Sequence, residues 1–166
     1  MKKADVVAEN RFMYKNPFEL FGLPISIYVH QATLDERYVE MMKDLHPDKF
    51  NGEDAFMKKS AEQISAYANE AYQILRSPLK CADTAIKAKD WKLPNEETTN
   101  DSILLMEMME LQDMAKSGHD LRPFYQDALV QFESALQEDS ETKTLAAYAR
   151  LKFLARLLGS IDATAN

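Results

Sequence analysis

The sequence predicts an all-α protein, and its composition gives three reasons for that prediction. The 166-residue chain has only four glycines, it lacks the alternating Val, Ile and Thr runs that form strands, and it is rich in Met, Leu, Ala, Glu and Lys. Apolar residues make up 46% of the chain, which is enough to form a core in one domain or in two small ones. We therefore expect helices throughout and no sheet.

In the first half of the chain, two helices are predicted to pack as an antiparallel hairpin. A short helical segment precedes them in NPFELFGLP, with Asn16 as its N-cap and Gly22 at its end. The first hairpin helix is expected to start with Thr33 as its N-cap, and the second to run from near NGED to near LRSP. Each helix has one apolar stripe. The stripes contain Leu34, Tyr38, Met41 and Leu45 in the first helix and Ile64, Tyr67, Ala68, Ala71, Ile74 and Leu75 in the second.

In the second half, a three-helix bundle is predicted after the polar connector KLPNEETTND. Helical patterns cover residues 101–117, 121–137 and 141–159, and Gly118 and Gly159 are expected to end the first and the last. The predicted domains are a tail of residues 1–16, a hairpin unit of residues 17–79, a connecting helix and linker of residues 80–100, and a bundle of residues 101–166.

The charge pattern and the lack of long apolar runs exclude several classes of protein. The net charge is −7, and residues 101–166 carry 6 basic and 11 acidic side chains. Phosphate backbones repel such a chain, so we expect no nucleic-acid partner. No run reaches the roughly 18 apolar residues of a membrane span, and no signal-peptide core is present. Asp5 and Glu9 favour the bacterial cytoplasm over an organellar precursor.

We expect neither a catalytic site nor a cofactor. The single cysteine, Cys81, cannot form an intrachain disulfide or a multi-cysteine metal site, and its apolar neighbours predict a buried structural thiol. His30 and His119 have no spacing typical of a metal site or a catalytic triad. Since a Gly-rich phosphate loop is also missing, we expect no enzyme activity, no bound nucleotide and no metal.

The motif His46-Pro47-Asp48 lies between the two hairpin helices. In a local interpretation, the histidine complements the helix dipole, the proline stops the helix and the aspartate binds nearby amides. In the other interpretation, the fixed φ of Pro47 stiffens the turn, so that an imidazole and a carboxylate project from it towards a partner. The tripeptide alone leaves both interpretations open.

With KF directly after this motif and NPFELFGL before the hairpin, residues 17–79 resemble a J-domain, the module that docks on DnaK-type chaperone ATPases and stimulates their ATP hydrolysis. The resemblance implies that Asp48 pairs with a chaperone arginine. The implied chaperone-binding residues are Arg37, Lys43, His46, Pro47, Asp48 and Lys49. Arg37 and Lys43 are the only basic residues of the first hairpin helix, against four acidic ones, so we expect weaker electrostatic steering than in a strongly basic J-domain.

The first helix of the bundle, in DSILLMEMMELQDMAKSG, has more apolar residues than one buried face can use. Its predicted core stripe contains Leu104, Met108, Leu111 and Ala115. The other side carries Leu105, Met106, Met109, Glu110 and Asp113. An exposed apolar patch edged with carboxylates predicts a partner site, whereas burial of the helix on all sides is the alternative. In the last helix Phe153 lies opposite the apolar arc, so it is a candidate exposed aromatic anchor.

HPDKF and RSPLKCA, combined with LLMEMMEL and RLKFLARL, are similar to the HscB family, the dedicated co-chaperones of iron–sulfur cluster assembly. This resemblance covers about residues 17–158. It implies that the bundle binds an IscU-like scaffold protein and that the J-domain delivers the scaffold to a HscA/DnaK-type chaperone. The implied scaffold-binding residues are Leu105, Met106, Met109, Glu110, Asp113 and Phe153.

The chain departs from the family pattern at three points. Met109 and Asp113 are mild exchanges for the expected Leu and Glu, and Ser117 lies near the position where a further acid is expected. The cysteine-rich zinc-binding extension of some eukaryotic relatives is missing, which agrees with a bacterial origin. We expect the acidic edge of the patch to be shorter than usual.

Two other functions stay open at this point. A general J-protein for unfolded clients would also contain HPD, but it should offer a broad apolar groove or a Gly-rich or zinc-binding region. A structural helical adaptor with an accidental HPD would leave ATPase rates unchanged. We expect instead that one end of the chain holds the scaffold and the other the chaperone, which raises their effective mutual concentration.

Overall fold

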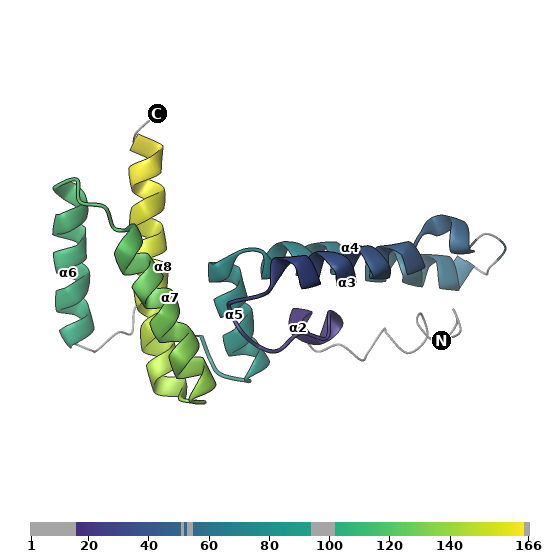
Figure 1. Ribbon diagram of the computed structural model, residues 1–166, viewed down its shortest axis with the longest axis horizontal. Coiled ribbons are helices and arrows are strands. Elements are labelled where there is room, and N and C mark those ends of the chain that lie inside the picture. Colours follow the sequence, from purple (N-terminus) through teal and green to yellow (C-terminus); the bar gives the residue numbers. More distant parts are fainter. Residues whose placement is uncertain (1–15, 51, 53–54, 94–101, 165–166) are drawn as a thin grey trace. The chain divides into compact units, whose positions relative to one another are not determined.

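The structure is a computed structural model that describes residues 16–50, 52, 55–93 and 102–164 (Figure 1). These residues form seven α-helices and one 3-10 turn, with no strand among them, which confirms the all-α prediction. Residues 1–15 of the expected tail, and most of the expected polar connector, lie outside the described residues. The chain divides into two compact units, Met1–Thr84 and Ala85–Asn166. The domain limits expected at residues 16, 79 and 100 stay a prediction.

The first unit opens with the short helix α2 (Pro17–Leu20), which is fixed at both ends. Oδ1 of Asn16 accepts a hydrogen bond from the backbone N–H of Glu19 at 3.1 Å, so Asn16 is the N-cap, as predicted. After the helix, Gly22 adopts a φ of 58°, in the left-handed region that favours glycine. Phe18 and Leu20 are buried, and α2 packs against α4.

Helices α3 (Gln31–Asp44) and α4 (Ala55–Leu75) form the predicted hairpin and lie side by side in Figure 1. The expected N-cap, Thr33, was wrong. His30 is the N-cap, because its backbone is extended and its Nδ1 accepts a hydrogen bond from the N–H of Thr33 at 3.3 Å. Thr33 therefore lies in the first turn, where its Oγ1 is 3.0 Å from the same Nδ1.

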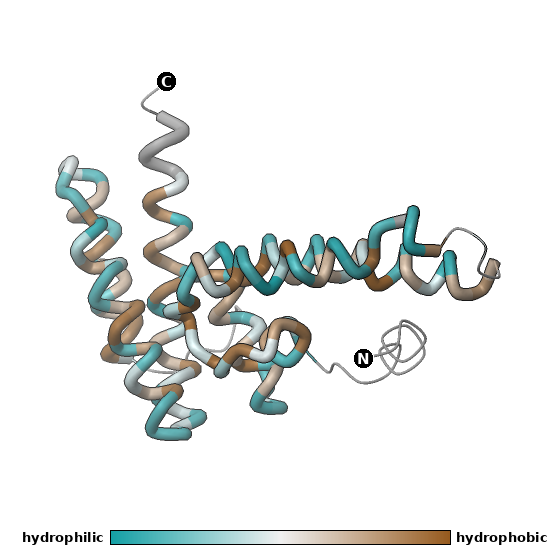
Figure 2. The backbone as a smooth tube through the Cα atoms, turned by 45° about the vertical axis from the view of Figure 1, so that its right-hand side comes forward, coloured by the Kyte–Doolittle hydropathy of each residue, from teal (hydrophilic) through white to brown (hydrophobic). Residues whose placement is uncertain are grey.

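The hairpin buries the apolar stripes that the sequence predicted, with one exception. Figure 2 shows hydropathy changing every few residues along both helices, as expected when one face of each is buried. Tyr67 was expected in the stripe but is exposed. The buried stripe residues are Leu34, Leu45, Ala68, Ala71 and Leu75, while Tyr38, Met41, Ile64 and Ile74 are half-buried.

Helix α5 (Pro78–Ala88) contains the single cysteine, and the division between the two units falls within this helix. Cys81 is completely buried, and its Sγ donates a hydrogen bond to the carbonyl oxygen of Ser26 at 3.4 Å. The prediction of a buried structural thiol is confirmed.

The second unit contains α6 (Ser102–Lys116), α7 (Arg122–Gln137) and α8 (Glu141–Thr164). Helices α7 and α8 share the largest contact, and α6 packs against α8. Gly118 follows α6 with a φ of 76°, as expected for a glycine that ends a helix. Gly159 was also expected to end a helix, which was wrong: it has no positive φ, so α8 continues through it to Thr164. The fully buried side chains of these three helices and their links include Phe132, Leu111, Leu121, Leu151 and Leu154.

Candidate functional site

The first candidate site is the HPD turn at the end of the α3–α4 hairpin. Helix α3 ends at Asp44 with Leu45 as its C-cap, and the 3-10 turn η1 (Pro47–Phe50) begins directly after His46. The side chains of His46 and Asp48 are 60% and 81% exposed, so both project into solvent. The turn thus presents an imidazole and a carboxylate, the arrangement that the contact-site interpretation required.

Hydrogen bonds and one buried ring hold this turn in place. The backbone N–H of Lys49 donates to the carbonyl of His46 at 2.9 Å, and Lys49 Nζ lies 2.6 Å from Asp44 Oδ1. Phe50 is buried against Leu45. Because the Phe50 ring is buried in the core, it holds the backbone of the turn that carries the exposed side chains of His46 and Asp48.

The orientation of the imidazole follows from its local contacts. The backbone N–H of Asp48 donates to Nδ1 of His46 at 3.3 Å. In the neutral tautomer that accepts this hydrogen bond at Nδ1, the proton lies on Nε2. Asp48 Oδ2 is 3.5 Å from the same Nδ1, so the two side chains of the motif lie next to each other. The turn thus places an exposed imidazole and an exposed carboxylate side by side.

The basic residues expected to support this site differ in their surroundings. The Lys43 side chain is exposed. Arg37 is also exposed, but its Nη1 donates to the backbone carbonyls of Phe21 and Gly22, which ties α3 to the end of α2. This contact could not be predicted from local patterns, because its partners are carbonyl groups more than ten residues away. The charge of Arg37 stays available for steering, while part of its hydrogen-bonding capacity is used within the unit.

The second candidate site is the outer face of α6. Leu105 and Met106 are 46% and 65% exposed, whereas Leu111 on the opposite side of the helix is buried. This arrangement contradicts burial of α6 on all sides. The remaining exposed side chains of this face are Met109, Glu110 and Asp113, together with Ile103, which the sequence analysis missed. We call Ile103, Leu105, Met106, Met109, Glu110 and Asp113 the α6 face.

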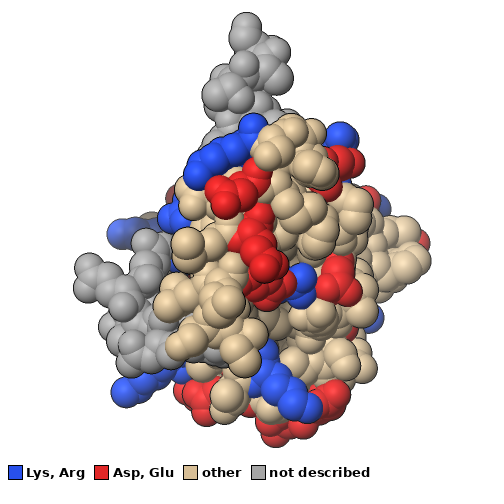
Figure 3. Space-filling view, turned by 90° about the vertical axis from the view of Figure 1, so that its left-hand side faces the viewer, with Lys and Arg blue, Asp and Glu red and all other residues tan. Residues whose placement is uncertain are grey.

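Carboxylates border the apolar part of the α6 face. Figure 3 shows acidic side chains beside neutral surface on the side of the molecule that carries α6. Asp113 forms an ion pair with Lys116 at 3.2 Å, and both side chains are well exposed. A surface pair of this kind contributes little to stability, so the Asp113 carboxylate can exchange Lys116 for another cation.

Phe153, the expected aromatic anchor, lies on α8 and is half-buried, not fully exposed. The guanidinium of Arg156 lies over its ring, with the central carbon 5.3 Å from the ring centroid. This cation–π contact covers part of the ring. The α6 face and Phe153 thus come from two helices that pack against each other.

Neither a metal site nor a membrane span is found within the described ranges. Those residues contain no group of three or more His, Cys, Asp and Glu side chains that could hold a metal ion. Within the same ranges, no helix combines the length and the apolar character that crossing a bilayer requires.

Comparison with known proteins identifies the family of the chain. No protein-family model matches it. A co-chaperone protein HscB homolog from Pasteurella multocida is 30% identical over 162 residues, which cover 89% of this chain and 94% of the relative. Another HscB homolog, from Mannheimia succiniciproducens, is 34% identical over 130 residues, which cover 77% of this chain and 74% of that relative.

Solved structures agree with these relatives. The chaperone HscB from Vibrio cholerae matches with a TM-score of 0.70 and 26% identity, over 90% of this chain and 96% of that chain. Human co-chaperone HscB has the same fold, with a TM-score of 0.77 and 20% identity over 92% and 83% of the two chains. The chain belongs to the HscB family of co-chaperones.

Proposed function

We propose that this co-chaperone binds an IscU-like iron–sulfur scaffold protein and delivers it to a HscA/DnaK-type chaperone, whose ATP hydrolysis it stimulates. Cluster transfer and the maturation of iron–sulfur proteins would follow. The observation that carries the proposal is the presence of two exposed sites on separate units. The HPD turn belongs to the first unit, and the α6 face belongs to the second.

At the HPD turn, a rigid pair of polar groups engages the chaperone. Pro47 fixes the backbone, His46 offers its Nε2–H, and Asp48 accepts a charge-assisted hydrogen bond from a chaperone arginine. Lys49, Lys43 and the charge of Arg37 contribute to the encounter. Helix α3 also carries Asp35, Glu36, Glu40 and Asp44, so net attraction to an acidic surface is small. Contact geometry at the turn, more than long-range steering, therefore determines the affinity.

At the other site, apolar side chains bind the scaffold. Leu105, Met106 and Met109 provide the centre of the contact, and methionines adapt their shape to the partner. Glu110 and Asp113 provide an acidic edge that selects a basic or amide-rich rim on the scaffold. The scaffold-binding set is completed by Phe153 on α8.

In this proposed function, the protein acts through binding alone, without catalytic groups or cofactors of its own. One chain that holds both partners converts their meeting into an intramolecular event, with an effective concentration in the millimolar range for short tethers. The expected setting is the bacterial cytoplasm, and the two bacterial relatives support a bacterial origin.

The test of the chaperone role is His46→Gln, with His119→Gln as the matched control. Both histidines are exposed, but His119 lies in the second unit, where its Nδ1 is 3.3 Å from the carbonyl of Met114. We expect His46→Gln to abolish stimulation of the HscA/DnaK-type ATPase in a steady-state assay, and His119→Gln to retain it. Because exposed substitutions shift stability by about 0.5 kcal/mol or less, both variants should melt like the wild type. Unchanged stimulation by His46→Gln would overturn the proposal.

The competing function, a general J-protein for unfolded clients, is tested on the complex of the wild-type protein with the scaffold. A reduced, unfolded polypeptide is added to the complex with the scaffold at increasing concentration. We expect no displacement of the scaffold, because the carboxylates that edge the α6 face select a partner with a complementary rim, which an unfolded chain does not present. Stoichiometric displacement by the unfolded chain would favour the general J-protein.

A further inference from the structure

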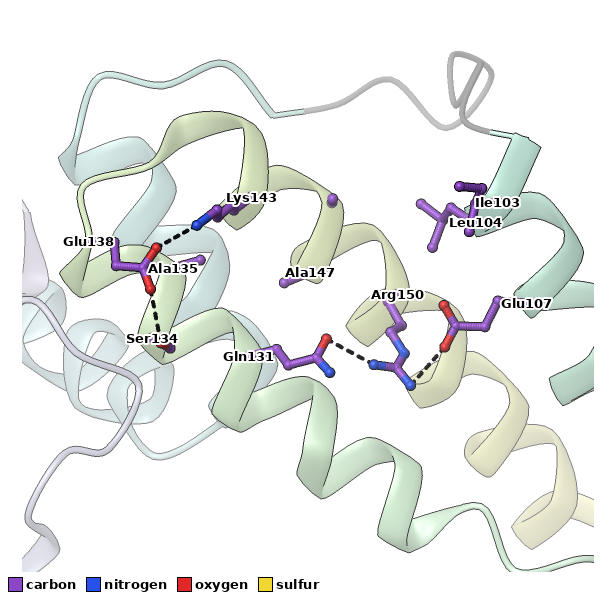
Figure 4. Close-up of a pocket in the computed structure, with 11 residues that line it drawn as sticks. Ile103, Leu104, Glu107, Gln131, Ser134, Ala135, Glu138, Lys143, Ala147 and Arg150 are labelled. Carbon is purple, nitrogen blue, oxygen red and sulfur yellow. Dashed lines mark hydrogen bonds and ion pairs between the residues drawn. The ribbon is translucent and has the colours of Figure 1, made fainter.

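Between α6, α7 and α8 lies an open groove of about 430 Å³, which shares only Ile103 with the α6 face. Ile103 and Leu104 of α6 form one wall, Ala135 of α7 and Ala147 of α8 form the others, and the side chain of Arg150 crosses the groove (Figure 4). The groove shows that α6 stands partly away from the paired helices α7 and α8 on this side.

Arg150 of α8 connects all three helices of the bundle. Its Nη2 is 2.7 Å from Oε1 of Glu107 on α6. Its Nη1 is 3.1 Å from Oδ2 of Asp127 and 2.9 Å from Oε1 of Gln131, both on α7. Gln131 in turn donates from Nε2 to the Asp127 carboxylate at 2.8 Å. A single side chain, only 12% exposed, therefore fixes one point of α6 relative to both partners.

The energetics of these contacts indicate that Arg150 positions the three helices more than it stabilises the fold. Nε of Arg150 is buried and has no hydrogen-bond partner among the described residues. An unsatisfied buried donor is unfavourable, and ion pairs whose carboxylates stay accessible to water, as those of Glu107 and Asp127 do, contribute little to stability. What the guanidinium provides, and an apolar side chain would not, is a fixed distance and direction between three helices.

The position of this contact links it to the scaffold-binding residues. Phe153 follows Arg150 by three residues on α8, and Glu110 follows Glu107 by three residues on α6, so each is a surface neighbour of one partner of the ion pair. Few apolar contacts attach α6 to the other helices, because only Leu104 and Leu111 of this helix are buried. A helix held in this way can rotate about its axis unless a directional contact prevents it.

We propose that Arg150 is a positioning residue that fixes the rotation of α6 and thereby aligns the α6 face with Phe153 for the scaffold. This inference rests on the proposed scaffold-binding function. Arg150 does not itself touch the scaffold; it acts through Glu107 on the orientation of the neighbouring side chains.

The test is Arg150→Met, which keeps the apolar stem and removes the guanidinium. The side chains of Glu107 and Asp127 are 36% and 55% exposed, so both carboxylates can be hydrated in the variant. We expect scaffold affinity to fall about tenfold, within the range of couplings carried by residues away from a binding site. Amide hydrogen exchange should become faster in α6, with α7 and α8 little changed.

The matched control is Lys143→Met. Lys143 lines the same groove, but its partner is Glu138, at 2.8 Å, so this ion pair does not involve α6. The control should bind the scaffold like the wild type and leave hydrogen exchange in α6 unchanged. An equal loss of affinity in Lys143→Met and Arg150→Met would show a general charge effect and overturn the inference.

A double-mutant cycle with Glu107→Gln separates positioning from direct contact and from loss of fold. If Arg150 acts through Glu107, Glu107→Gln alone weakens scaffold binding, and the double variant is no weaker than Arg150→Met. Independent, additive losses would overturn the inference. If Arg150→Met unfolds the bundle, Glu107→Gln alone tests the proposal. Wild-type scaffold affinity in Glu107→Gln would contradict it.

The failure of this inference differs from that of the proposed function. Wild-type affinity in Arg150→Met, together with weak binding by Leu105→Ala/Met106→Ala, rejects only the positioning role. Wild-type affinity in Leu105→Ala/Met106→Ala rejects the scaffold site itself, and the positioning role with it.

Discussion

The double variant Leu105→Ala/Met106→Ala separates a binding role of the α6 face from a structural one. Full burial of a Leu or Met side chain stabilises a fold by roughly 1.5–3 kcal/mol. Leu105 and Met106 are 46% and 65% exposed, so each truncation should lower the free energy of unfolding by about 1 kcal/mol or less. A bound partner buries the remaining apolar surface, and central apolar anchors of an interface typically lose about 2 kcal/mol or more each on truncation.

Leu111→Ala provides the matched control on the same helix. Leu111 is only 2% exposed, and truncation of a buried leucine costs about 2–5 kcal/mol of stability. Isothermal titration with an IscU-like scaffold and urea unfolding followed by circular dichroism are measured on all three proteins. We expect the double variant to lose several kcal/mol of binding free energy with little loss of stability. The control should show the larger loss of stability and, where it stays folded, the smaller loss of affinity.

The reverse pattern would refute this reasoning. A double variant that unfolds as easily as Leu111→Ala while retaining wild-type affinity would mean that Leu105 and Met106 belong to the core. The α6 face would then have no role as a scaffold site.

Three further predictions concern the first unit. Asn16→Ala should lower its free energy of unfolding by about 1 kcal/mol in urea, because it removes the N-cap of α2; Asn16→Asp, which preserves the cap, should not. Gly22→Ala should destabilise by about 1–2 kcal/mol, since φ is 58° and the added Cβ would lie 3.1 Å from Arg37 Nη1; wild-type stability would contradict the tie between α2 and α3. The hydrogen bond to Asp35 raises the pKa of Tyr72 above its usual value of about 10. The Tyr72 hydroxyl thus keeps its proton to a higher pH in the folded state than in the unfolded state. The stabilising contribution of its hydrogen bond is therefore present below about pH 10 and is lost as pH rises through the raised pKa. Tyr72→Phe should abolish that loss in unfolding measured at alkaline pH, and an unchanged alkaline profile would contradict the assignment.

The local features of the fold could be predicted from the sequence because they depend on neighbours in the chain. The cap at Asn16 and the end of α6 at Gly118 follow from side-chain and backbone chemistry within a few residues. Where two local solutions compete, the sequence alone does not decide. Thr33 and His30 can both cap α3, and the extended backbone at His30 selects the histidine. Gly159 shows that a glycine ends a helix only where the chain turns with positive φ.

The tertiary contacts near the sites could not be predicted, because their partners lie far apart in the chain. Nothing in the sequence connects Arg37 to the carbonyls of Phe21 and Gly22. The same holds for the contact of Arg150 with Glu107, across more than forty residues. Both arginines stand in ordinary helical patterns, and only the packing of the helices gives them their partners. The exposed face of α6, by contrast, followed from helical periodicity except at Ile103, whereas the exposed HPD turn depends on the stiff link between two helices and not on a helical pattern.

Co-capture measures whether one chain holds the chaperone and the scaffold at the same time. A HscA/DnaK-type chaperone is immobilised, the scaffold is added with each variant of this protein, and the retained scaffold is quantified. We expect strong retention with the wild type. For both His46→Gln and Leu105→Ala/Met106→Ala, we expect retention to fall to the level without co-chaperone, although each variant keeps its other site. Equal retention of the scaffold with the wild type and with either variant would contradict the claim.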